Sequence, residues 1–232
     1  MNPLLVGRVL SLGLLVVLVV VLALSACGGE EKKKKAEARP LPEKPKALRP
    51  GTYRSEEFKP SLSFHVGKGW SSSPLEASDV LQITRGQTAG LGFLNVQEVY
   101  NTPRTGTPNG VDAPKDIAGW LQQHPYLQTS KPEPVTVGGV KGLQFDEVLG
   151  DLPQTYSGTC TTIVGQPNCV DLYRLSTGGP IFLVEGEKAR AIVLEDVEGE
   201  TVTIGFASPA SEFGEFAPEA QKVLDSVEWR GS

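Results

Sequence analysis

The longest uncharged stretch of the chain, Val9–Ala26, decides which part of the sequence can fold as a water-soluble domain. It reads VLSLGLLVVLVVVLALSA, and only Arg8 places a positive charge before it. A run of this length has two ordinary interpretations, the apolar core of a signal peptide or a short transmembrane helix. In both cases these residues do not contribute to the core of a soluble domain. The folded part must therefore come from the residues that follow.

The apolar run ends in Leu24-Ser25-Ala26-Cys27, which resembles the lipobox of bacterial lipoproteins. A leucine stands three positions before the cysteine, and two small residues follow it. The resemblance implies that residues 1–26 are a signal peptide and that Cys27 becomes the lipidated first residue of the mature protein. Two acyl chains on a diacylglyceryl group give durable attachment. We therefore expect the protein on the outer face of the cytoplasmic membrane. The alternative is an uncleaved helical anchor.

The segment after Cys27 is rich in lysine and proline. Residues 28–50 read GGEEKKKKAEARPLPEKPKALRP and contain eight basic and four acidic residues, with little to bury. This composition predicts a disordered tether over residues 27–50, whose cations lie near the lipid headgroups. The remainder, residues 51–232, has 13 basic and 23 acidic residues. A domain of that charge is expected to repel nucleic acid.

Short runs of alternating apolar and polar residues predict a β-rich domain over residues 51–232. Leu62, Phe64 and Val66 alternate with polar residues, which is the period of a half-buried strand. Gly138-Gly139 separates two such runs and predicts a hairpin. The other expected strands cover residues 53–58, 80–84, 91–99, 170–175, 181–185, 189–194 and 201–207.

Two segments have helical spacing instead. Residues 115–124 begin after Pro114 and place Ile117, Ala118 and Leu121 on one face. The C-terminal segment has the same pattern, and we expect its regular part to begin near Pro218. Strands in a meander combined with two helices favour an α+β fold, in which helices cover an antiparallel β-sheet.

Three segments carry a resemblance to a known family. They are SLSFHVGKGW near the start of the domain, PVTVGGVKGLQF in the middle and APEAQKVLDSVEW at the end. Together with the order of the elements, they resemble the PsbP-like α/β/α sandwich over most of residues 53–230. The resemblance implies a single domain with a scaffolding, assembly or binding role rather than a catalytic one. A fold alone does not determine function.

The two remaining cysteines, Cys160 and Cys169, are expected to form a disulfide, because the protein is predicted to work outside the cytoplasm. They lie in or next to the second of two long loops, residues 101–114 and 150–169. Long loops in compact domains often carry function. The sequence therefore makes these loops the first place to look for a binding site, with Tyr156 and Asn168 as candidate residues.

No cofactor and no metal site is expected, since His65 and His124 lack the spacing of metal ligands. The sequence predicts a non-enzymatic lipoprotein that presents a binding or assembly domain to an envelope protein or a small ligand. Two alternatives are a cell-surface hydrolase with an unrecognised site and a ligand-sensing module. A pocket lined by either histidine with a carboxylate and a serine favours the hydrolase. A smooth apolar groove favours a binding protein.

Overall fold

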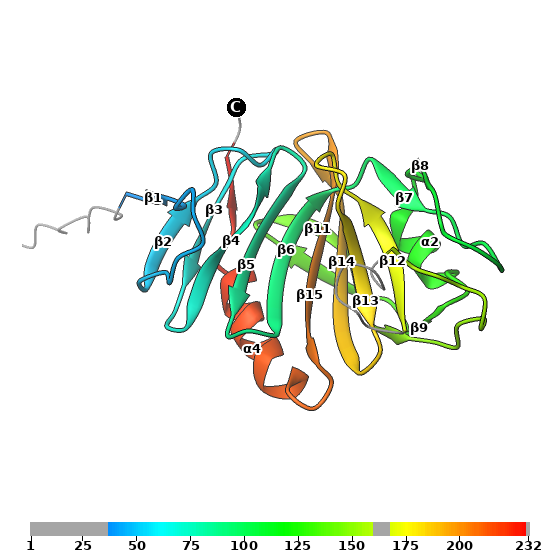
Figure 1. Cartoon of the computed structure of the whole chain (residues 1–232). Coiled ribbons are helices and arrows are strands. Elements are labelled where there is room, and N and C mark those ends of the chain that lie inside the picture. Colours follow the sequence, from blue (N-terminus) through cyan, green and yellow to red (C-terminus); the bar gives the residue numbers. More distant parts are fainter. Residues whose placement is uncertain (1–36, 160–167, 231–232) are drawn as a thin grey trace, which may run out of the picture. The chain divides into compact units, whose positions relative to one another are not determined.

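The computed structural model describes residues 37–159 and 168–230, and its largest element is an antiparallel sheet of eight strands (Figure 1). Seven strands follow the order β10-β11-β14-β15-β6-β5-β4, and β9 pairs with the end of β11. Their bounds are β4 (Trp70–Ala77), β5 (Val80–Arg85), β6 (Ala89–Asn95), β9 (Leu127–Thr129), β10 (Glu133–Val137), β11 (Val140–Leu149), β14 (Glu187–Val197) and β15 (Glu200–Pro209).

Two smaller sheets accompany the large one. The first has the order β1-β2-β3-β16 and the second β13-β12-β7-β8. Their bounds are β1 (Arg39–Pro40), β2 (Gly51–Arg54), β3 (Leu62–Val66), β7 (Glu98–Tyr100), β8 (Gly110–Asp112), β12 (Cys169–Arg174), β13 (Pro180–Val184) and β16 (Glu228–Trp229). Figure 1 shows β2 and β3 at one side of the large sheet and β7, β8 and β12 at the other.

One face of the large sheet carries large apolar side chains and packs against the helix α4 (Phe213–Leu224). Phe206 on β15 stacks on Phe213 with 5.8 Å between ring centroids. The prediction that this helix begins near Pro218 is wrong, since Pro218 lies inside it. Burying the rings of Phe213 and Phe216 contributes about 1.5–3 kcal/mol each. That is enough to offset the cost of about 3 kcal/mol for an internal proline.

The other face packs against β12, β13 and the short helix α2 (Ile117–Gln122). The residues expected to form one strand, 91–99, instead form two strands in different sheets. β6 ends at Asn95, and β7 begins at Glu98 and pairs with β12. The two residues between them carry the chain from the large sheet into the smaller one.

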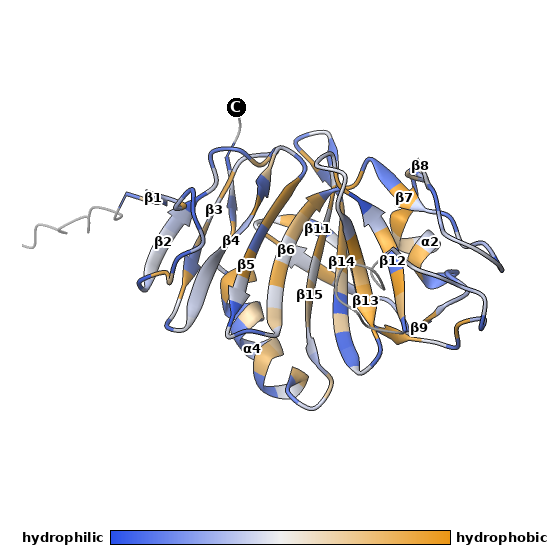
Figure 2. Cartoon of the chain, viewed as in Figure 1, coloured by the Kyte–Doolittle hydropathy of each residue, from blue (hydrophilic) through white to orange (hydrophobic). Residues whose placement is uncertain are grey.

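The predicted fold class is correct in its antiparallel sheet and overstates the cover by helices. The described residues contain only two helices, and the smaller sheets cover much of what the helices were expected to cover. Figure 2 shows apolar residues along β5, β6, β13 and β14, so the strands themselves supply most of the buried surface. Neither helix in residues 37–159 and 168–230 is long and apolar enough to cross a membrane. The apolar run Val9–Ala26 lies outside these residues.

The prediction of a disordered tether over residues 27–50 is wrong for its second half. The compact unit begins at Glu37, and Ala38, Leu41 and Leu48 are buried. The backbone pairs with the edge of the large sheet: Leu48 N–H donates to the Trp70 carbonyl at 2.8 Å. A few apolar residues are enough here because the unpaired edge of β4 supplies backbone partners. Residues 27–36 lie outside the described residues.

Candidate ligand-binding cavity

Small side chains share the central part of the sheet face that looks toward β12 and β13. The register of the ladders places Gly92 opposite Gly205 and Gly205 opposite Ala191. In the next row, Gly90 on β6 lies opposite Ala207 on β15, and Ala207 lies opposite Ala189 on β14. The six small residues are Gly90, Gly92, Ala189, Ala191, Gly205 and Ala207. Side chains of this size leave space between the two layers, because strand residues alternate strictly between faces.

A cavity of about 340 Å³ fills this space. Its volume lies within the range of small-molecule sites, about 300–1,000 Å³. The large sheet forms one wall, and residues 180–183 of β13 with Leu172 and Tyr173 of β12 form the other. Gln87 and Thr88, which are exposed in the turn between β5 and β6, lie at the rim. The cavity therefore reaches the surface at this turn.

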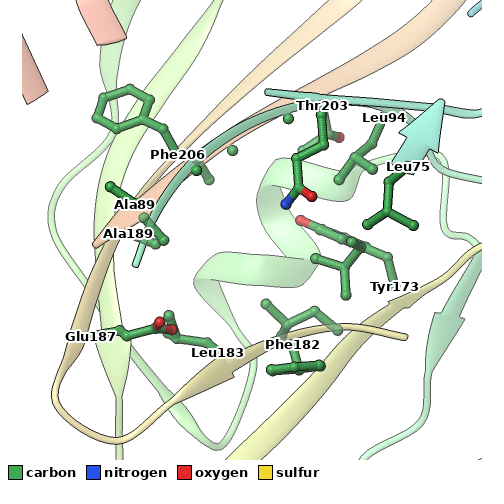
Figure 3. A pocket seen from close by; sticks show the side chains of 18 of the residues that line it. Leu75, Ala89, Leu94, Tyr173, Phe182, Leu183, Glu187, Ala189, Thr203 and Phe206 are labelled. Atoms are coloured by element: carbon green, nitrogen blue, oxygen red, sulfur yellow. The ribbon is translucent and has the colours of Figure 1, made fainter. Parts of the chain in front are cut away.

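The walls are mostly apolar, and Figure 3 shows how the polar side chains are distributed over them. Tyr173 and Thr203 lie toward one end of the cavity, and Glu187 lies toward the other. Thr203 is 1% exposed, and its hydroxyl has no hydrogen-bond partner within the described residues. Burial and the nearby charge of Glu147 raise the pKa of Tyr173.

Glu147 on β11 is the most unusual of these groups. Its side chain lines the cavity and is 6% exposed, and Oε2 has no hydrogen-bond partner among the residues that the structure describes. Burial raises the pKa of this carboxyl to about 7. A buried carboxyl without a partner is costly, which is why such groups mark candidate sites.

Glu187 is better satisfied. The Val184 backbone N–H donates to its Oε2 at 3.3 Å. Burial raises the pKa of Glu187, and this hydrogen bond opposes the rise. Two carboxyl groups, Tyr173 and Thr203 thus stand among mainly apolar walls, which also include Gln82 and Thr84, with Gln87 and Thr88 at the rim. This arrangement is typical of a binding site in which a few polar groups orient a mainly apolar molecule.

The residues proposed from sequence do not line this cavity. Tyr156 is half-buried, and its Oη accepts a hydrogen bond from the Asp171 backbone N–H at 3.3 Å. Burial raises its pKa to about 12. Asn168 is exposed and donates from Nδ2 to Glu185 Oε2 at 2.6 Å. Gly106 forms a bridge with Tyr156, so the two long loops are joined to each other. In their described parts they support the domain rather than form the cavity.

The cysteines fall partly outside the described residues. Cys27 and Cys160 lie outside them, whereas Cys169 is the buried first residue of β12. The predicted Cys160–Cys169 disulfide therefore stays a prediction. The same holds for lipidation of Cys27.

The histidines also lie elsewhere. His65 is exposed on β3, and no histidine is among the described residues that line the cavity. His124 is buried, and its Nδ1 accepts a hydrogen bond from the Tyr126 N–H at 3.3 Å. Burial lowers the pKa of His124 to about 4. Within residues 37–159 and 168–230, no group of three His, Cys, Asp or Glu side chains is placed to hold a metal ion.

The sequence signal for the cavity lies in two strands rather than in the long loops or at the histidines. AGLGF at residues 89–93 and TIGFA at 203–207 alternate small and large residues along a strand. Glycine inside a strand often marks a close approach of another group. Two such strands side by side predict a recess on the face where the small residues lie.

No protein-family model and no curated protein matches the sequence. The solved structures that resemble the chain distantly include the following two. The solution structure of the cyanobacterial PsbP protein CyanoP from Synechocystis sp. PCC 6803 aligns with a TM-score of 0.40 and 11% identity, over 79% of this chain and 95% of that one. The crystal structure of LpqN, described as involved in cell envelope biogenesis of Mycobacterium tuberculosis, aligns with a TM-score of 0.34 and 12% identity, over 80% and 90%. Scores at this level do not establish a shared fold, so the PsbP-like resemblance stays a prediction from sequence.

Proposed function

We propose that the protein is an extracytoplasmic lipoprotein, anchored through Cys27, whose folded domain binds a small apolar ligand in the cavity between β6, β15, β14 and β13. One observation carries the binding role. A cavity of about 340 Å³ is formed by glycine and alanine residues on neighbouring strands, and a buried, unpaired carboxyl group lines it. In a purely structural core, larger side chains would be expected to fill such a space, because protein interiors pack closely.

The composition of the cavity supports binding over catalysis. Activation of a nucleophile needs a base within hydrogen-bond reach. The Thr203 hydroxyl has no such partner among the described residues, and the described lining residues include no histidine. The hydrolase alternative required a histidine, a carboxylate and a serine around one pocket. The apolar walls instead match the criterion for a binding protein.

The binding role is tested with Nile red, an uncharged dye whose emission rises in apolar surroundings. We expect the wild-type protein to bind it and Gly205→Leu to bind it at least about tenfold more weakly, a loss of about 1.4 kcal/mol. A Cβ atom built on Gly205 meets nothing within 4 Å, so the new side chain enters the cavity without a backbone clash. Gly205→Ala provides a smaller step in the same direction.

Gly214→Leu is the matched control. Gly214 is exposed on α4, and a Cβ atom there also meets nothing within 4 Å. This variant is expected to bind the dye like the wild type. Equal binding by all variants, with unchanged circular dichroism, would refute the cavity as the binding site.

The anchor is tested separately. Replacing Cys27 by serine removes the thiol that accepts the lipid, so we expect the protein to leave the membrane fraction while its domain stays folded. Membrane attachment as firm as that of the wild type would show that Val9–Ala26 is an uncleaved spanning helix. The partner envisaged from sequence, a small ligand or an envelope protein, then becomes accessible at the outer face of the cytoplasmic membrane.

We also propose that Cys160 and Cys169 form a disulfide, as expected for a cysteine pair outside the cytoplasm. The test is alkylation of the unfolded, unreduced protein followed by mass measurement. We expect no alkyl group on either cysteine before reduction and two after it. Alkylation before reduction would contradict the pairing.

A further inference from the structure

We propose that the cavity selects ligands whose polar head donates hydrogen bonds and carries no negative charge, with Glu147 and Thr203 as the groups that receive it. This inference rests on the proposed binding function and specifies its ligand class. The expected ligand is an apolar chain that ends in an amine or a hydroxyl group. A fatty acid or a phosphate-bearing lipid is expected to be excluded.

The charges around the cavity carry the first step. Glu147 and Glu187 line it, whereas no lysine, arginine or histidine is among the described lining residues. A carboxylate or phosphate would therefore be buried without a counter-ion, next to two carboxyl groups. Burying an unpaired charge is strongly unfavourable, and a neighbouring like charge adds to that cost.

The cations of β14 do not relieve this cost. Lys188 and Arg190 alternate with Ala189 along the strand and so belong to the opposite face. There both are paired with Asp146, at 2.7 Å for Lys188 and 2.6 Å for Arg190. Lys188 and Arg190 are thus paired with Asp146 on the opposite face of the sheet and do not bind an anion in the cavity.

The unpaired polar atoms carry the second step. Glu147 Oε2 and the Thr203 hydroxyl are buried and have no hydrogen-bond partner within the described residues. A carboxylate only accepts hydrogen bonds, and a hydroxyl both donates and accepts. An ammonium or hydroxyl head supplies the donor that Glu147 lacks, and a cationic head also neutralises its charge. The remaining walls include Gln82 and Thr84 but are mainly apolar, with Val80, Leu94, Leu172 and Leu183 among their residues, and they suit a hydrocarbon chain.

The experiment is competition against bound Nile red at pH 8 with three ligands of equal chain length, decylamine, decanol and decanoate, each below its micelle concentration. We expect decylamine and decanol to displace the dye and decanoate to be at least about tenfold weaker, because its carboxylate offers Glu147 no donor and adds a further negative charge. In Glu147→Gln, the advantage of decylamine over decanol is expected to fall about tenfold.

Glu195→Gln is the control, because it makes the same charge change at an exposed position on β14 that does not line the cavity. It is expected to keep the wild-type preference. Displacement by decanoate as strong as by decylamine would overturn the inference and leave the binding function standing. A Glu147→Gln variant that keeps the full preference for decylamine would overturn the role of Glu147. Absence of dye binding by the wild type would remove the proposed function itself, and with it this inference.

Discussion

Asp79 accepts two hydrogen bonds from Ser176, one from its backbone N–H at 2.6 Å and one from its hydroxyl at 2.7 Å. Asp79 stands in the turn between β4 and β5, and Ser176 stands in the turn between β12 and β13. The pair therefore ties the large sheet to the smaller sheet that forms the other wall of the cavity. Asp79 is only 8% exposed, whereas Ser176 is exposed, so the carboxylate is the buried member of the pair.

Removing this tie is expected to destabilise the domain. Asp79→Ala loses two hydrogen bonds to a charged group, so the free energy of unfolding should fall by about 2–4 kcal/mol. Ser176→Ala loses one bond and should cost about half as much. Urea denaturation measures both. Asp196→Ala is the control, because Asp196 is exposed and accepts one bond from Gly199 N–H. An equal effect of Asp79→Ala and Asp196→Ala would contradict the prediction.

The hairpin between β10 and β11 offers a matched pair of glycines. Gly138 and Gly139 both have positive φ, at 57° and 85°. A Cβ atom on Gly138 would lie 2.6 Å from the indole of Trp229, whose Nε1 donates to the Val137 carbonyl, whereas a Cβ atom on Gly139 meets nothing. Alanine costs about 1–2 kcal/mol at either position for its backbone conformation.

The collision with Trp229 should add about 1–3 kcal/mol for Gly138→Ala alone. Thermal unfolding of the two variants gives the difference in stability, and a change in tryptophan fluorescence in Gly138→Ala but not in Gly139→Ala reports on displacement of Trp229. Identical melting temperatures for Gly138→Ala and Gly139→Ala would show that Trp229 yields without cost.

Two buried ionisable groups are expected to change stability in opposite directions with pH. Glu147 has a pKa of about 7 in the folded state, above its ordinary value of about 4.5, so the folded state holds this proton more tightly. Raising the pH through this window therefore removes about 3 kcal/mol of stability, and the loss is complete above pH 7.

His124 acts in the reverse sense. Its pKa of about 4 lies below the ordinary 6.5, so the unfolded state takes up the proton first as the pH falls. The stability contributed by neutral His124 is fully present above pH 6.5. About 3 kcal/mol of it is lost as the pH falls through 4.

The two effects should nearly cancel in the wild type and separate in single variants. Urea denaturation between pH 4 and 8 is the measurement. Glu147→Gln should become more stable as the pH rises, because of the two opposing contributions only that of His124 remains. His124→Asn, which keeps an acceptor for the Tyr126 N–H, should become less stable. If the free energy of unfolding of the two variants changes with pH in the same direction, the prediction of opposite contributions from Glu147 and His124 is wrong.

The segment before β2 is expected to contribute to stability like part of the core. Leu48 is 5% exposed, so Leu48→Ala should lower the free energy of unfolding by about 2–4 kcal/mol. Lys46→Ala is the control, since Lys46 is exposed and pairs with Ser72 through its backbone. A loss below about 0.5 kcal/mol for Leu48→Ala would mean that this segment is not docked in solution.

Regular patterns in the sequence predicted the regular parts of this fold. The Gly138-Gly139 hairpin and the strands between residues 170 and 207 follow from alternation and turn residues, and both are confirmed. β4 was missed because WSSSPLEA has no apolar alternation, and its conformation comes from pairing with β5. The break between Asn95 and Glu98 was missed because local pattern does not report which sheet a strand joins.

The candidate site was harder to predict because the cavity forms where glycine and alanine residues leave space unfilled. A glycine such as Gly205 carries no chemical signal of its own, and it marks a cavity only once Gly92 is known to lie beside it. Glu147 likewise resembles any charged residue in a strand until burial is known. Both facts depend on strand register and layer packing, which a single sequence does not specify.

The packing of Ala38, Leu41 and Leu48 against the domain also limits the length of the linker to the membrane, if Cys27 carries the lipid as proposed. With Ala38 already held by the domain, eleven residues remain to span the distance from the bilayer, and a fully extended chain reaches about 40 Å over that length. The domain would then stay within about 40 Å of the lipid headgroups. Its ligand would be met at the membrane surface or on leaving the bilayer, within a distance comparable to the diameter of the domain itself.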